Sequence, residues 1–150
     1  MTKKALMLLA TVALMVVAAS VAASAVATAA TSIGETETTS HIEAHLRPVG
    51  DSGVHGTVHL FQLPTEGTQI VVLAKGLKPG KRYVSLYYDN NRCALEPYSE
   101  DDIIGGPYTA LPGGFGFTTG IADDDLDEIN SVSVRSAKTF KLLACARVRH

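Results

Sequence analysis

Four of the five histidines fall within residues 41–59. They are His41, His45, His55 and His59. The stretches 41–47 and 54–62 both alternate polar and apolar side chains, which is typical of half-buried strands. If the chain turns about Gly50, the first histidine faces the fourth and the second faces the third, on the same side as Glu43. Opposed side chains in a hairpin lie about 5 Å apart at Cβ, so this face predicts a zinc or copper site.

The alternative for these histidines is a plain structural one, since histidine is a tolerable polar residue on a solvent-facing strand. A register change of one residue would also disperse the cluster, because it moves every side chain to the other face. Beyond this face the chain lacks a Gly-x-Ser-x-Gly elbow, a phosphate-binding loop and a cysteine nucleophile with a basic partner.

Residues 1–30 read as an export signal. Lys3 and Lys4 precede an uncharged run from Ala5 to Ala30, and small-x-small patterns stand near its end. We expect a secreted or periplasmic protein whose flexible lead-in covers residues 31–40 and whose folded domain covers 41–150. The alternative is an uncleaved segment, which would be the only contact with a membrane.

The part that remains after cleavage is the size of one domain, about 120 residues. It has 11 basic and 15 acidic residues, a net charge near −4. The basic residues are scattered along the sequence without interleaved aromatic residues, so no nucleic-acid partner is expected.

Two cysteines, Cys93 and Cys145, are the only ones in the chain. In an exported protein this count predicts one disulfide, and two free thiols are the alternative. Closing a loop of about fifty residues would stabilise the fold by roughly 4 kcal/mol in the chain-entropy model.

Short alternating segments separated by Gly and Pro predict an all-β antiparallel barrel or sandwich of about eight strands. The expected strands are 41–47, 54–62, 69–74, 82–88, 108–111, 115–119, 132–135 and 141–148. No helical stripe of convincing length follows residue 40.

The order of several short motifs resembles the Cu,Zn superoxide dismutase family. These are the return strand Gly56-Thr57-Val58-His59-Leu60-Phe61, the turn Gly76-Leu77-Lys78-Pro79-Gly80, Cys93, the glycine-rich hairpin at 113–116 and Leu143-Ala144-Cys145. The resemblance covers the mature domain and implies a Greek-key barrel in which the two cysteines form the family disulfide. The extracellular domains named for chordin share the style of the turn and are an alternative assignment.

The family's metal ligands are missing from this sequence. The family carries His-x-His on the strand after the turn, and here those positions look like Ser85 and Tyr87. Arg135 looks like the residue in the place of the last copper-binding histidine. Copper that cycles between two oxidation states needs several imidazoles, and no histidine occurs between His59 and His150.

We therefore expect a non-catalytic binding or structural module with no cofactor, which could also form a homodimer. The alternatives are a zinc or copper sink or carrier that uses the first-hairpin histidines, and an enzyme with a new site around Ser85, Tyr87 and Arg135. The sequence names no partner.

Overall fold

The computed structural model describes residues 40–150. The expected export signal and all but the last residue of the expected lead-in lie outside these residues. Within residues 40–150 the chain forms eight strands and no helix. They are β1 (His41–Pro48), β2 (His55–Gln62), β3 (Thr68–Lys75), β4 (Arg82–Tyr88), β5 (Tyr108–Thr109), β6 (Gly116–Ala122), β7 (Ser131–Ser136) and β8 (Leu142–Arg147). The all-β prediction is confirmed. In this part of the chain we find no helix with the length and hydropathy of a membrane span.

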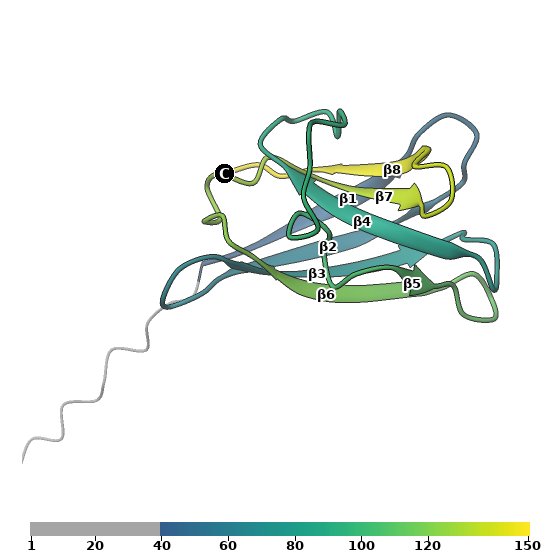
Figure 1. Cartoon of the computed structure of the whole chain (residues 1–150), viewed down its shortest axis with the longest axis horizontal. Helices are drawn as coiled ribbons and strands as arrows, with labels where there is room; N and C mark the ends of the chain where they lie inside the picture. Colours follow the sequence, from purple (N-terminus) through teal and green to yellow (C-terminus); the bar gives the residue numbers. More distant parts are fainter. Residues whose placement is uncertain (1–39) are drawn as a thin grey trace, which may run out of the picture. The chain divides into compact units, whose positions relative to one another are not determined.

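The strands form one antiparallel sheet in the order β5-β4-β7-β8-β1-β2-β3-β6. Figure 1 shows β4, β7 and β8 lying across β1, β2 and β3. The two end strands, β5 and β6, meet through a tight hairpin in which Leu111 N–H donates to the carbonyl of Phe115 at 2.7 Å. The sheet therefore curls into a nearly closed barrel.

The barrel interior is filled by the apolar positions of the alternating strands. Ala44 and Leu46 of β1 and Val58 and Leu60 of β2 are all buried, as the period-two pattern predicts. Leu77, from the turn between β3 and β4, is also buried in this core, and its N–H donates to the carbonyl of Gly114 at 3.1 Å.

The register of the first hairpin differs from the prediction by two residues. Ile42 lies opposite Leu60, and His41 lies opposite Phe61 instead of His59. The loop contains two glycines in the left-handed conformation, Gly50 at φ 57° and Gly53 at φ 67°, so the chain reverses about Asp51. A shift of two residues keeps every side chain on its expected face and changes only which residues are opposed.

A second, smaller core lies on the outer face of β4 and β7. The segment 89–107, here called the disulfide loop, covers this face, and Cys93 of the loop is bonded to Cys145 of β8. The buried residues of this core are Val84, Leu86, Tyr88 and Cys93. The predicted disulfide is therefore present, and it joins the loop to the last strand.

Candidate functional site

The four histidines of the first hairpin share one outer face of β1 and β2, but only His41 and His59 contact each other. His41 Nε2 lies 3.2 Å from His59 Nδ1, and the two rings are stacked with centroids 5.5 Å apart. Glu43, opposite His59 in the register, approaches its Nδ1 at 3.8 Å. The direct opposition that we expected is thus replaced by a diagonal contact.

The other two histidines do not join this pair. His45 lies opposite Thr57, and the His55 ring Nδ1 contacts the carbonyl oxygen of Gly53 at 3.0 Å. Among residues 40–150 no group of three or more His, Cys, Asp or Glu side chains is arranged to hold a metal ion. The structure therefore brings together His41, His59 and Glu43, and it leaves His45 and His55 apart from them.

Ser85 and Tyr87 point into the barrel. Both are buried, and Ser85 Oγ lies 3.1 Å from the phenol oxygen of Tyr108. Burial raises the pKa of Tyr108 to about 12. The pKa of Tyr87 is also raised to about 12, by burial first and then by the negative charge of Asp124. Both phenols are therefore protonated near neutral pH.

Arg135 lies on the opposite face of the sheet from Ser85 and Tyr87. It pairs with Val84 in the ladder, whereas Ser85 pairs with Val134. Its guanidinium is buried and donates to the phenol oxygen of Tyr88 at 2.9 Å and to two backbone carbonyl oxygens, those of Phe140 and Cys93, both at 2.7 Å. The expected grouping of Arg135 with Ser85 and Tyr87 is therefore wrong, because alternation sends them to different faces.

The two raised tyrosine pKa values predict a loss of stability at alkaline pH. Unfolded tyrosine ionises near pH 10, whereas Tyr87 and Tyr108 ionise in the folded chain at about 12. The unfolded state thus loses its protons first, and the free energy of unfolding falls as the pH rises from about 10 to 12. Urea denaturation across this range measures the fall.

The Tyr108→Phe variant should show a shallower fall, and Tyr98→Phe, which changes an exposed ring, should match the wild type. Native protein in which all five tyrosines ionised together near pH 10, as followed by phenolate absorbance, would contradict this prediction.

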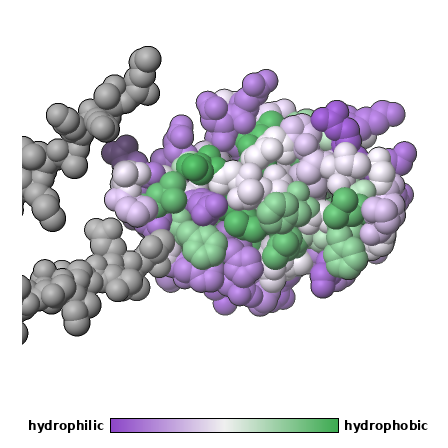
Figure 2. Space-filling view, turned by 90° about the horizontal axis from the view of Figure 1, so that it is seen from below, coloured by the Kyte–Doolittle hydropathy of each residue, from purple (hydrophilic) through white to green (hydrophobic). Residues whose placement is uncertain are grey.

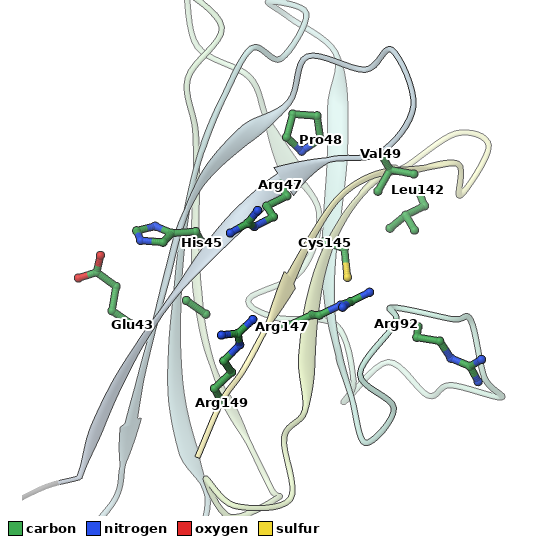
Figure 3. Close-up of a pocket in the computed structure, with 11 residues that line it drawn as sticks. Glu43, His45, Arg47, Pro48, Val49, Arg92, Leu142, Cys145, Arg147 and Arg149 are labelled. Carbon is green, nitrogen blue, oxygen red and sulfur yellow. The ribbon is translucent and has the colours of Figure 1, made fainter.

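Sequence reasoning missed a groove on the outside of the seam between β1 and β8. We call it the arginine groove, because it is lined by four exposed arginines, Arg47, Arg92, Arg147 and Arg149. Its volume is about 650 Å³, and His45 and Glu43 also line it. Figure 3 shows Arg47, Arg147 and Arg149 over the seam, with Arg92 standing on the disulfide loop to one side.

The disulfide explains how these arginines meet. Arg47 lies directly opposite Cys145 in the short β1–β8 pairing. Arg147 follows two residues later on the same face of β8, and Arg92 is the neighbour of Cys93, which is bonded to Cys145. The sequence feature that could have indicated this groove is the pair Arg147 and Arg149, two residues apart where β8 ends. No local sequence pattern, however, predicts that the first and last strands are neighbours.

An exposed apolar surface lies on the outer face of β3 and β6. Leu73, Phe117 and Ile121 stand there with 40%, 54% and 67% of their surface exposed. Figure 2 shows apolar side chains gathered on the face seen from below, the side on which β6 lies in Figure 1. A second groove at its edge is also lined by His45, which therefore stands between the two grooves.

No model of a known protein family matches the sequence, and no curated protein is significantly similar to it. The functional conclusion therefore rests on the geometry of residues 40–150.

Proposed function

We propose that this protein is an exported, non-catalytic binding domain with the barrel of the Cu,Zn superoxide dismutase type. The strand order supports the barrel type. β5 lies beside β4, a tight hairpin connects β5 to β6, and β7 returns to lie beside β4, which is consistent with a Greek-key connection. The disulfide supports an oxidising compartment, because such bonds persist outside the reducing cytosol.

The observation that carries the non-catalytic part is the filled space under the disulfide loop. Val84, Leu86 and Tyr88 pack there as a small core, and all three acceptors of the Arg135 guanidinium are groups of the protein itself. A space packed with apolar side chains and an arginine that makes three hydrogen bonds offers none of the imidazole or thiolate ligands that redox-active copper takes.

The purified protein, incubated with copper and zinc and then dialysed, is expected to consume superoxide no faster than buffer carrying the same residual metal. Superoxide decay followed by ultraviolet absorbance gives the rate, and elemental analysis gives the metal content. Stoichiometric copper together with a rate well above that of the free ion would contradict the proposal.

A second candidate function is metal binding at the first hairpin. His41 Nε2 and His59 Nδ1 are 3.2 Å apart, and Glu43 approaches His59 at 3.8 Å. Two imidazoles and a carboxylate are a three-residue ligand set of the kind zinc accepts when water completes its shell. The two side chains would have to reorient slightly, because their ring nitrogens contact each other at 3.2 Å.

Calorimetric titration with zinc and with copper separates the two functions. If the hairpin binds metal, the His41→Asn/His59→Asn variant loses the heat of binding. The matched control His45→Asn/His55→Asn, on the same face, then keeps it. Equal heats for the wild type and both variants would exclude this second function.

A further inference from the structure

The arginine groove concentrates positive charge on a protein whose net charge is negative. Four guanidinium groups, from Arg47, Arg92, Arg147 and Arg149, line one groove of about 650 Å³. Gathered like charges repel one another, and their repulsion is relieved by counter-charges within a few ångströms. An anion bound in this groove would therefore be stabilised by the four positive charges.

Of the residues that the structure describes, Glu43 is the one carboxylate that lines the groove, and its ion pair is with His59 and not with an arginine. Within residues 40–150 the single ion pair joins His59 and Glu43, and no groove arginine takes part in it. The four guanidinium groups also donate no hydrogen bond to other groups of the described chain. Arg135, by contrast, uses its guanidinium for three. Arg135 is thus a structural arginine, whereas the groove arginines keep their donors free for a ligand.

The shape and chemistry of the groove limit what this ligand is. Sites for small molecules have volumes of about 300–1,000 Å³, and the groove falls in this range. The planar guanidinium fork matches the paired oxygens of phosphate, sulfate and carboxylate groups. Because Arg92 stands on the disulfide loop to one side of the other three arginines (Figure 3), one small ion would contact only some of the four.

We infer that the arginine groove binds a small organic polyanion carrying two or more phosphate or sulfate groups. This inference rests on the proposed function as a binding domain and gives it a ligand class. A long polyanion fits less well, because the acidic remainder of the protein would repel the parts of the polymer outside the groove.

Isothermal titration of the oxidised protein, in buffer without divalent metals, tests the inference. The probes are inorganic pyrophosphate, a disulfated disaccharide and orthophosphate, which has a single group. We expect one site that binds pyrophosphate or the disaccharide at least tenfold more tightly than orthophosphate. Binding of pyrophosphate alone assigns a phosphate ligand, and binding of the disaccharide alone assigns a sulfate ligand. The affinity should fall as salt is raised, because the groove is solvent-exposed.

Arginine substitutions inside and outside the groove test whether the ligand binds there. Arg47→Ala and Arg147→Ala should each lower the affinity at least tenfold. Arg82→Ala, which removes an exposed arginine outside the groove, should leave it unchanged. Because all three side chains are exposed, the thermal midpoints should remain close to that of the wild type, so that a loss of binding is not a loss of folding. Equal affinity of all variants, or no binding of either two-group probe, would overturn the inference.

The two proposals fail separately. A protein that binds neither probe and does not consume superoxide would lack the groove ligand and still be non-catalytic. A protein that binds pyrophosphate and also dismutates superoxide with stoichiometric copper would keep the groove ligand and contradict the proposed function.

Discussion

Replacing both Cys93 and Cys145 with alanine is expected to lower the free energy of unfolding by about 4 kcal/mol. The reason is that the disulfide closes a loop of about fifty residues and so lowers the conformational entropy of the unfolded chain. The two cysteines are 52 residues apart in the sequence. The bond also fixes the disulfide loop over its small core, and Cys93 is fully buried there. Urea denaturation, with the midpoint and slope fitted for both proteins, measures the change.

Reduction of the wild type gives an independent comparison. The reduced wild type and the double-alanine variant should unfold at similar urea concentrations, since both lack the same loop constraint. Hydrogen exchange should show the largest loss of protection at Ile103 and Ile104, whose N–H groups bond to Glu100 and Ser85 where the loop meets the sheet. Coincident unfolding curves for the oxidised and reduced wild type would contradict the expectation.

The Arg135→Leu variant is expected to lose about 3 kcal/mol of stability. The substitution leaves two carbonyl oxygens, those of Cys93 and Phe140, without the donors that they have now. Each unsatisfied buried acceptor costs about 1–3 kcal/mol. The phenol of Tyr88 retains its contact with Ser133 Oγ at 2.8 Å, so the loss of its hydrogen bond to Arg135 lowers the stability less. Thermal unfolding should show a fall of more than about 10 °C for a domain of this size.

Two further variants serve as a control and as an intermediate case. Arg82→Leu makes the same change at an exposed position of β4 and should stay within about 0.5 kcal/mol of the wild type. Arg135→Lys keeps the charge but cannot reach three acceptors in different directions, so it should fall between the other two. A thermal midpoint for Arg135→Leu equal to that of Arg82→Leu would show that the three hydrogen bonds contribute nothing.

The effects of the cysteine and arginine substitutions should not add. Arg135 donates to the carbonyl of Cys93, so the disulfide and the guanidinium hold the same loop. Residues that share one network show interaction energies of about 0.5–3 kcal/mol. Once the disulfide is absent, the Arg135→Leu substitution should therefore cost less than it does in the oxidised protein.

Local patterns were enough to predict the strands and the disulfide. The alternation of Ala44 and Leu46 with polar neighbours predicts which side of β1 is buried. This prediction needs no knowledge of the rest of the fold, because the alternation follows from the pleat of a single strand. The pairing of the first hairpin was predicted with the correct faces and a register two residues off. The error arose at Gly53, which shares the turn with Gly50, because both glycines can adopt the left-handed conformation and the sequence does not say which will define the reversal.

The grouping of side chains from distant parts of the chain could not be predicted in this way. Ser85 and Arg135 are on strands that pair, yet they face opposite sides of the sheet. The pairing register places Ser85 opposite Val134 and Arg135 opposite Val84, and neighbouring residues in a strand point to opposite faces. The sequence by itself thus determined an all-β chain with one disulfide and with polar and apolar faces on its first strands. Only the tertiary structure decided that β8 lies beside β1, which joins Arg47, Arg92 and Arg147 in one groove. The physical reason is that strand alternation is a local property of the backbone, whereas strand neighbours are chosen by the packing of the whole barrel.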